Sequence, residues 1–286
     1  MTTTRRVTAN QHRKRAMWQK AICYVFLTLA GVVVFFPIYY AIATSFFTPA
    51  ESLSYPPTLF PSKITLVSYE EALRRAPVFR FILNSFIVSA SVMFGQLITA
   101  SLAAYSFSFL EYKGRQVLFY IVLSTMMVPW EVTIISNYLT IKALNWTDTY
   151  LGLSVPFMAS AFGIFLLRQG FMTIPRELKD AAEIDGCSDL RFFTTIVLPL
   201  SRPMMATLAV YTFLNTYNQY LWPLLVTNVD RMRTVQIGLA MLQWDESVAW
   251  NSTMAGVVMV LVPTAILMLF GHKQLVSGLT SGALKG

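Results

Sequence analysis

The chain has 286 residues, of which 55% are hydrophobic and 13% are charged, and its formal net charge is +8. A soluble domain carries about 25% charged residues, so this composition excludes an ordinary soluble domain and indicates a polytopic membrane protein. The apolar residues form long runs, whereas the strands of an outer-membrane barrel are short and alternating, so we predict an all-α protein.

Six runs of the sequence are long, apolar and nearly free of charge. A membrane-spanning helix needs about 20 apolar residues, and each run is long enough, the third only if it tolerates Glu131. We expect residues 1–20 to form a basic tail and residues 21–286 to form one transmembrane domain. The six transmembrane helices are predicted, in chain order, at residues 21–47, 81–110, 116–141, 149–167, 203–229 and 247–271.

The tail before the first run is basic. It can be interpreted as a nucleic-acid or anionic-lipid binding segment, but the positive-inside rule explains it without a further assumption. With both termini in the cytoplasm, the cytoplasmic segments carry more Lys and Arg than the outer ones. We therefore expect both termini inside, contact with membrane lipid and no nucleic-acid partner. The first run is too long for a secretory signal, so we interpret it as an uncleaved helix.

The third run contains an acidic residue, Glu131, directly after Pro129 and Trp130. A lone acid inside a membrane predicts a functional site, whereas an acid just beyond a helix end lies at the membrane surface, and the sequence leaves both open. Prolines recur in five of the six runs and predict kinks that would suit a gated cavity. These prolines are Pro37, Pro129, Pro156, Pro223 and Pro263.

The connection between the fourth and fifth runs, residues 168–202, is long and charged. Thr173 and Pro175 are helix-start signals and Gly186 is a stop signal, so a short helix is predicted over about 175–185. Ser188 and Asp189 can cap a second helix, which Pro199 is expected to end.

One face of the first short helix is made of small and short side chains. Leu178, Ala181, Ala182 and Asp185 share this face by their spacing. About three helical turns are not stable alone in water, so the helix must pack on something. The pattern fits a knob that docks in a groove of a partner, and it also fits an interfacial helix with a solvated face.

Polar and aromatic residues are concentrated in the fifth run. Unpaired amides in hydrocarbon are costly, so these residues should face a wet path or bind other helices. Amides and aromatic faces also suit a sugar, and Asn218 and Gln219 are the stronger candidates for a path. The set comprises Asn215, Tyr217, Asn218, Gln219, Tyr220 and Trp222, with Glu131 as a further candidate from the third run.

Several motifs together resemble those of ABC importer permeases. The EAA loop of that family runs E-A-A, three residues, Gly, nine residues, I-x-L-P. Here Ala181 and Ala182 are followed after three residues by Gly186, and after nine more residues by Ile196, Leu198 and Pro199. Asp180 stands where the family has Glu. Leu83-Asn84-Ser85, Ile184-Asp185-Gly186 and residues 217–224 resemble the carbohydrate group of this family, and the chain looks like the second, six-helix permease of its maltose and glycerol-3-phosphate systems.

This resemblance implies a type I ABC importer permease fold in a bacterial or archaeal cytoplasmic membrane. It implies that an extracytoplasmic binding protein delivers a sugar or sugar phosphate, either glycerol-3-phosphate-like or an oligosaccharide. It further implies a second permease subunit and two cytoplasmic ATPase subunits that bind ATP and Mg. The coupling helix that docks on the ATPase would comprise Asp180, Ala181, Ala182, Glu183, Asp185 and Gly186.

The outer segments 48–80 and 228–249 are long. A freely diffusing solute needs no such loops, whereas a docking protein does, although simple loop packing is also possible. In the maltose-type family the loop before the last span reaches into the binding protein. The resemblance therefore makes contact candidates of Arg231, Arg233, Gln243 and Trp244.

The residues argue against two other classes of protein. A secondary transporter or channel would have charged coupling residues in its spans and an inverted repeat, but only Glu131 is a candidate and no repeat is evident. An intramembrane enzyme would need paired acids or a histidine pair, but His12 and His272 lie near the termini. The sequence has no phosphate-binding loop, so we expect no catalytic site, no metal site and no cofactor in this chain.

Overall fold

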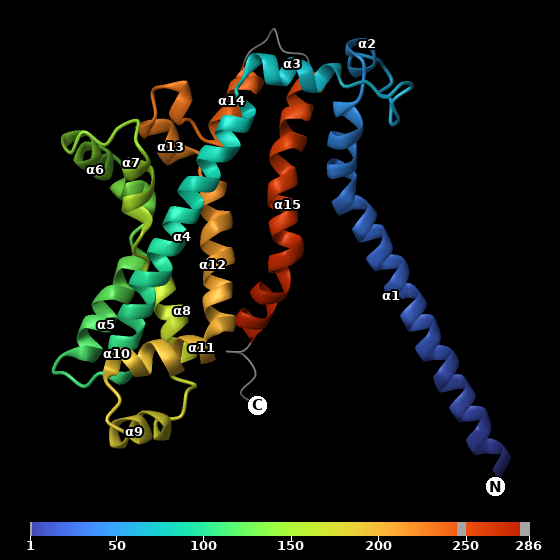
Figure 1. Cartoon of the computed structure of the whole chain (residues 1–286). Coiled ribbons are helices and arrows are strands. Elements are labelled where there is room, and N and C mark those ends of the chain that lie inside the picture. The colour runs from blue at the N-terminus through green and yellow to red at the C-terminus, as the bar shows by residue number, and fades with distance from the viewer. Residues whose placement is uncertain (1, 245–249, 281–286) are drawn as a thin grey trace. The chain divides into compact units, whose positions relative to one another are not determined.

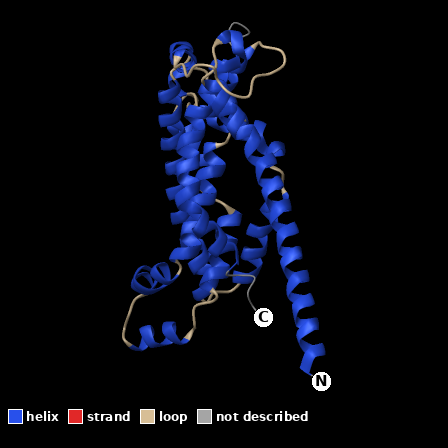
Figure 2. Ribbon diagram, turned by 90° about the vertical axis from the view of Figure 1, so that its right-hand side faces the viewer, coloured by secondary structure: helices blue, strands red, loops and turns tan. Residues whose placement is uncertain are grey.

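The computed structural model of the chain describes residues 2–244 and 250–280. This described part is helical and contains no strand (Figures 1 and 2), which confirms the predicted all-α class. The α-helices are α1 (Thr2–Ser45), α2 (Pro49–Ser52), α3 (Val67–Arg75), α4 (Val78–Phe109), α5 (Arg115–Ser124), α6 (Trp130–Ala143), α7 (Tyr150–Ser154), α8 (Ala161–Phe171), α9 (Glu177–Ile184), α10 (Asp189–Phe192), α11 (Leu198–Leu200), α12 (Arg202–Tyr217), α13 (Leu221–Val226), α14 (Val235–Trp244) and α15 (Trp250–Thr280). Short 3-10 helices are η1 (Thr125–Met127), η2 (Val155–Phe157) and η4 (Asp230–Met232), and η3 (Phe193–Val197) is a π-helix.

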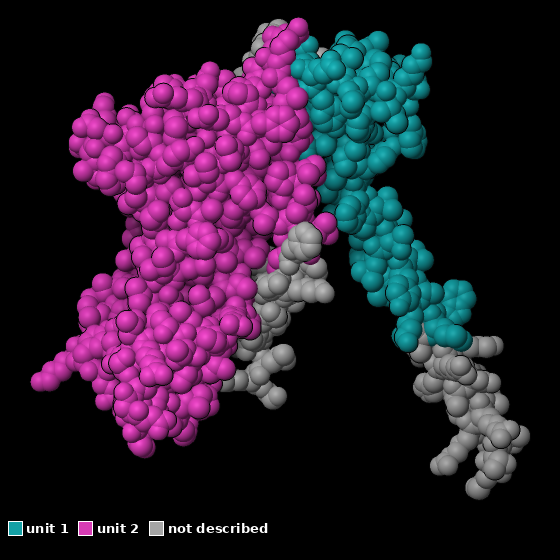
Figure 3. Space-filling model, viewed as in Figure 1, with its two compact units in different colours: residues 1–72, 246–258 teal, residues 73–245, 259–286 magenta. Residues whose placement is uncertain are grey.

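The chain forms two compact units (Figure 3). Unit 1 contains Met1–Ala72 and Glu246–Val258, and unit 2 contains Leu73–Asp245 and Met259–Gly286. Within unit 1, the buried amide of Asn251 donates hydrogen bonds to the carbonyl of Phe47 at 3.0 Å and to the hydroxyl of Ser68 at 3.0 Å. This side chain therefore joins three separate stretches of unit 1.

Unit 2 is built around the packing of α4, α8 and α12. Small residues permit this close approach, as they do between membrane helices in general. A Cβ atom added to Gly163 of α8 would lie 3.2 Å from Ala100 of α4 and 3.3 Å from Leu208 of α12. Ala100 and Leu208 are both fully buried, so the three helices pack closely at Gly163.

Among the described residues, three helices are long and apolar enough to cross a membrane: Met17–Ser45 within α1, Val78–Phe109, which is α4, and Trp250–Leu269 within α15. Up to six spans result if each of three bent helix pairs counts as one. The pairs are Arg115–Met127 with Trp130–Ala143, Tyr150–Phe157 with Ala161–Phe171, and Asp189–Leu200 with Arg202–Tyr217, bent by 97°, 48° and 77° respectively.

Prolines explain where three of the predicted continuous spans are interrupted. A proline ring clashes with the carbonyl four residues earlier and has no N–H to donate. Pro129 precedes α6 at the 97° bend, Pro156 lies in η2 before α8, and Pro223 lies in α13, which is separated from α12 by residues 218–220. By contrast, Pro37 and Pro263 lie inside the continuous helices α1 and α15.

The expected stop at Pro199 is wrong, because helical structure continues to Leu200. The five residues Phe193–Val197, just before α11, form a π-helix. A wider π turn moves backbone carbonyls away from the positions they hold in an α-helix, which accommodates the proline ring that follows. The chain turns only at Ser201, where α12 departs at 77°.

The loops of unit 2 gather at its two ends (Figure 1). Helices α9 and α10 and the α4–α5 turn lie at one end, and α6, α7 and α13 lie at the other. The helical body therefore separates the two groups of residues that the sequence singles out as partner contacts.

Candidate functional site

Helix α9 ends in a glycine motif that its sequence dictates. Gly186 has φ +70°, a left-handed conformation that L side chains rarely adopt. Its N–H donates to the carbonyl of Glu183 at 3.0 Å, and the N–H of Cys187 donates to the carbonyl of Ala182 at 2.8 Å. This pair of bonds is a Schellman motif, so α9 stops at the predicted glycine.

The next helix, α10, begins at a side-chain cap. The hydroxyl of Ser188 accepts a hydrogen bond from the N–H of Arg191 at 3.4 Å, which satisfies one of the free donors of the first turn. Asp189 occupies that first turn, where an acid is favoured by the helix dipole. The carboxylate of Asp189 is thereby fixed opposite α9.

Lys179 of α9 carries the ion pairs of this region. Its Nζ lies 2.6 Å from Oδ1 of Asp189 and 2.9 Å from Oε1 of Glu183. Burial by itself would lower the pKa of Lys179, but the hydrogen bonds with Asp189 and Glu183 outweigh burial and hold this pKa above its usual range. The lysine is therefore charged at every physiological pH.

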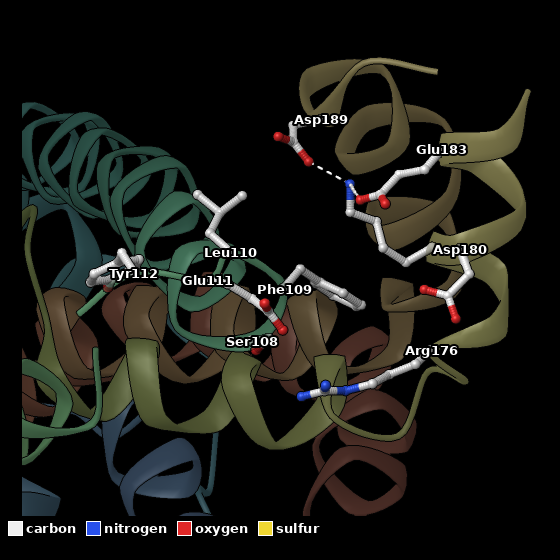
Figure 4. Close-up of a pocket in the computed structure, with 10 residues that line it drawn as sticks. Ser108, Phe109, Leu110, Glu111, Tyr112, Arg176, Asp180, Glu183 and Asp189 are labelled. Atoms are coloured by element: carbon white, nitrogen blue, oxygen red, sulfur yellow. Dashed lines mark hydrogen bonds and ion pairs between the residues drawn. The ribbon is translucent and has the colours of Figure 1, made fainter. Parts of the chain in front are cut away.

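An open cavity of about 680 Å³ separates α9 from the end of α4. One wall is the segment Ser108–Tyr112, and the other carries charged side chains from residues 176–189 (Figure 4). No group of three or more His, Cys, Asp or Glu among the described residues could hold a metal ion. The charged side chains that line the cavity are four acids and two bases, and such a polar surface suits recognition of a partner. Its charged lining residues are Glu111, Arg176, Lys179, Asp180, Glu183 and Asp189.

Most of the predicted docking residues are exposed, and one is not. Ala182 is 7% exposed and packs in the core of unit 2, in a cluster that includes Phe171 and Phe192. Helix α9 therefore turns Ala182 inward and presents acids and small residues outward. The exposed members are Asp180, Ala181, Glu183, Asp185 and Gly186.

The candidates for a solute path are divided between the core and the surface. Asn215 and Asn218 are exposed, and their amides donate to carbonyls of their own helix, those of Tyr211 at 3.0 Å and Leu214 at 2.8 Å. The Asn218 oxygen also accepts from Gln236 at 3.2 Å. Gln219 and Tyr220 are partly buried in the break between α12 and α13.

The two large aromatic candidates are packed inside the protein. Tyr217 is 1% exposed and its ring stacks on Phe213 at a centroid distance of 6.0 Å. Trp222 is 1% exposed, and its Nε1 donates to the carbonyl of Gly152 at 3.0 Å. Neither ring presents a face to an open path in the unit described here.

Glu131 lies in the first turn of α6, directly after the 97° bend, and it is exposed. This position is near a helix N-terminus, where a negative charge is favourable. The bend thus separates Glu131 from the apolar helix α5 that precedes it.

The predicted outer contact residues lie on or after η4. Arg231 is exposed, and Arg233 is partly buried and pairs with Asp230 at 3.0 Å. Gln243 is exposed near the end of α14. The side chain of Trp244 lies outside the described residues.

A buried asparagine, which the sequence offered only as a family marker, holds the loop around η4. Asn84 of α4 is fully buried, and its Nδ2 donates to the carbonyls of Arg231 at 2.9 Å and Arg233 at 2.8 Å. Its Oδ1 accepts from the hydroxyl of Tyr150 at 2.8 Å. The next residue, Ser85, accepts from the N–H of Val235 at 2.9 Å. In the sequence, the only sign of this role is that Asn84 and Ser85 form a polar pair within an apolar run.

The chain is similar to known transport proteins over almost its whole length. A family model described as "Binding-protein-dependent transport system inner membrane component" matches residues 96–277. The sn-glycerol-3-phosphate transport system permease protein UgpE of Brucella abortus (strain 2308) is 37% identical over 267 residues, which cover 90% of this chain and 95% of the relative. The protein of the same name from Escherichia coli O1:K1 / APEC is 37% identical over 270 residues, covering 92% and 96%.

Two solved structures have a similar fold. One is a chain of a bacterial ABC transporter involved in the import of the acidic polysaccharide alginate, with a TM-score of 0.81, 22% identity and coverage of 90% of this chain and 96% of that chain. The other is a chain of a bacterial alginate ABC transporter in complex with alginate pentasaccharide-bound periplasmic protein, with a TM-score of 0.61, 14% identity and coverage of 93% and 94%. These likenesses concern the fold alone.

Proposed function

The chain belongs to the family of inner membrane components of binding-protein-dependent transport systems, and from this premise we propose that it moves a sugar or sugar phosphate through the membrane. The family and the type I permease fold confirm what the motifs predicted. The observation that carries the solute class is the 37% identity to glycerol-3-phosphate permease proteins over 90% of this chain. A glycerol-3-phosphate-like solute is the first candidate and an oligosaccharide the second.

We propose that ATP hydrolysis is supplied by two separate ATPase subunits, which bind ATP and Mg, and that a second permease subunit and an extracytoplasmic binding protein complete the complex. The exposed acids and small residues of α9 support docking at this helix, because α9 projects from the helical body and is stopped by a rigid glycine motif. In this proposal both termini and α9 lie in the cytoplasm, and the Arg231 loop faces the binding protein.

Co-purification tests this proposal. The chain is expressed with the neighbouring transport genes of its genome, and the complex is reconstituted in lipid vesicles. We expect an ATPase subunit to co-purify, and we expect the binding protein, loaded with glycerol-3-phosphate or an oligosaccharide, to stimulate both ATP hydrolysis and uptake. Absence of any co-purifying ATPase would contradict the proposed assembly, and stimulation by neither solute would contradict the proposed substrate class.

Two substitutions of Asp180 test the proposed docking surface, one as the disruptive variant and one as its control. Asp180→Lys reverses an exposed charge on α9 and should abolish uptake while the chain still inserts into the membrane. Asp180→Glu keeps the charge and restores the acid that is usual in the EAA loop, so uptake should remain near wild type. Equal uptake by both variants would remove Asp180 from the docking surface.

A further inference from the structure

Helix α9 is attached to the membrane helix α4 through the carboxylate of Asp189. We propose that Asp189, together with Lys179 and Tyr105, is a positioning link that transmits a displacement of α9 to α4. This inference rests on the proposed function, in which the ATPase docks on α9. It assigns a role to three residues that the docking motif does not include.

The link is continuous from α9 to α4. Lys179 Nζ on α9 lies 2.6 Å from Oδ1 of Asp189, at the start of α10. The hydroxyl of Tyr105, in the last turns of α4, donates to the same Oδ1 at 3.0 Å and to the Asp189 carbonyl at 3.2 Å. One carboxylate oxygen is therefore shared between a donor from α9 and a donor from α4.

The two donors are shielded from water, although the acceptor is not. Tyr105 is 6% exposed, and the side chain of Lys179 is 13% exposed, whereas that of Asp189 is 56% exposed. Lys179 also lies over the ring of Phe192 at 5.4 Å, and the ring of Tyr105 packs on Phe193 at a centroid distance of 5.1 Å. The donors are thus held in place by aromatic packing, and Asp189 joins them from the cavity side.

Directional bonds are needed at this place because the other attachment of α9 is apolar. Ala182 packs in the core through a single methyl group, a contact that provides no directional polar bond. Hydrogen bonds to a charged oxygen weaken steeply when their geometry changes. A movement of α9 therefore strains the bonds of Asp189, and Tyr105 carries that strain to α4.

Removal of one hydroxyl tests the link. In the reconstituted complex, Tyr105→Phe keeps the ring and its packing but breaks the bond to Asp189. We expect ATP hydrolysis to continue and the amount of solute taken up per ATP to fall by about threefold to tenfold, the range that one hydrogen bond can supply. Tyr120→Phe is the matched control, since Tyr120 lies on α5 and its ring packs on Phe119.

A second series distinguishes transmission from simple stability. Lys179→Met should lower the uptake per ATP, and Lys179→Arg should restore it, because arginine retains a charged donor for Asp189. Combined with Tyr105→Phe, Lys179→Met should add little further loss, since both changes break the same link.

The outcomes separate this inference from the proposed function. A wild-type complex without stimulated ATP hydrolysis would contradict the proposed function itself. A coupled wild type whose uptake per ATP is unchanged in Tyr105→Phe and in Lys179→Met would overturn the link alone. Fully additive losses in the double variant would also overturn it, because independent sites and not a shared oxygen would then be responsible.

Discussion

The two loops proposed to meet partners are held in opposite ways. The loop around η4 is fixed through its backbone, because Asn84 donates to the carbonyls of Arg231 and Arg233. Helix α9 is fixed through its side chains, by the ion pairs of Lys179 and the burial of Ala182. A loop that is held through its backbone can vary its side chains without losing its position. A loop that is held through its side chains needs particular residue types at those positions.

This difference explains why one loop has a recognisable sequence motif. In the α9 region, Gly186 must adopt φ +70° and Ala182 must fit in a packed core, so residue types are constrained. In the η4 region the constraint lies on Asn84, which is far away in the sequence. Motif recognition therefore finds the first loop directly, whereas for the second it marks Asn84 without showing that this residue holds the loop.

The largest effect is expected from removal of the outer clamp. Asn84→Ala leaves the carbonyls of Arg231 and Arg233 and the hydroxyl of Tyr150 without this buried partner. The Arg231 carbonyl keeps a hydrogen bond from Arg80 at 3.3 Å, so the Arg233 carbonyl and the Tyr150 hydroxyl are the groups that lose most. Each unpaired buried group costs about 1–3 kcal/mol and the lost side chain leaves a cavity, so the total loss should be about 3 kcal/mol or more. Thermal unfolding of the purified complex should show a clearly lower Tm.

Asn137→Ala is the control for this variant, since the Asn137 amide bonds at 3.4 Å to Thr133 of its own helix. This substitution should lower the free energy of unfolding by no more than about 0.5 kcal/mol. An unchanged Tm in Asn84→Ala would mean that the outer loop keeps its position without the clamp.

The next effect is expected at the end of α9. Gly186→Pro removes the N–H that donates to Glu183, and a proline cannot adopt φ +70°. A misfit of this kind costs about 3 kcal/mol, so the stop of α9 should be lost and uptake with it. Uptake by reconstituted complexes measures this, alongside membrane insertion of the variant.

Gly186→Asn is the matched control, because asparagine tolerates the left-handed conformation and a Cβ at this position meets nothing within 4 Å. We expect it to retain most of the uptake. If proline and asparagine had the same effect, the backbone conformation at Gly186 would not be what matters.

The smallest effect on stability is expected at the exposed surface of the outer loop. Arg231→Ala removes an exposed side chain but keeps the carbonyl that Asn84 holds. The free energy of unfolding should change by about 0.5 kcal/mol or less, as for other surface substitutions, so the Tm should stay close to that of the wild type. The concentration of binding protein needed for half-maximal ATP hydrolysis should nevertheless rise, by about tenfold if one charged contact is lost.

Arg233→Ala provides the comparison, because Arg233 is partly buried and pairs with Asp230 at 3.0 Å. Arg233→Ala should both lower the Tm and weaken the stimulation of ATP hydrolysis by the binding protein. A normal response of Arg231→Ala to the binding protein would indicate that Arg231 makes no contact with it.

Part of the candidate site followed from the sequence. The helix signals placed the stop of α9 at Gly186 and the cap of α10 at Ser188, since both depend on local backbone chemistry. The burial of Ala182, Tyr217 and Trp222 did not follow, because neither a small residue nor an aromatic one near a helix end shows from the sequence which neighbour covers it. The expected helix end at Pro199 was wrong for a similar reason. The π turn over Phe193–Val197 relieves the clash between the proline ring and the preceding turn, and no residue pattern predicts such a turn.

The sequence by itself determined the membrane class, the helical fold and the position of the charged loop, because each rests on composition, periodicity or local turn chemistry. The family followed from the resemblance of its motifs to those of known permeases. Only the tertiary structure decided which residues hold the two loops. Asn84 meets Arg231 across 147 positions of the chain, and Tyr105 meets Asp189 across 84. Such pairings depend on how α4 packs against the rest of unit 2, and side-chain hydrogen bonds between distant segments leave no periodic trace in a single sequence.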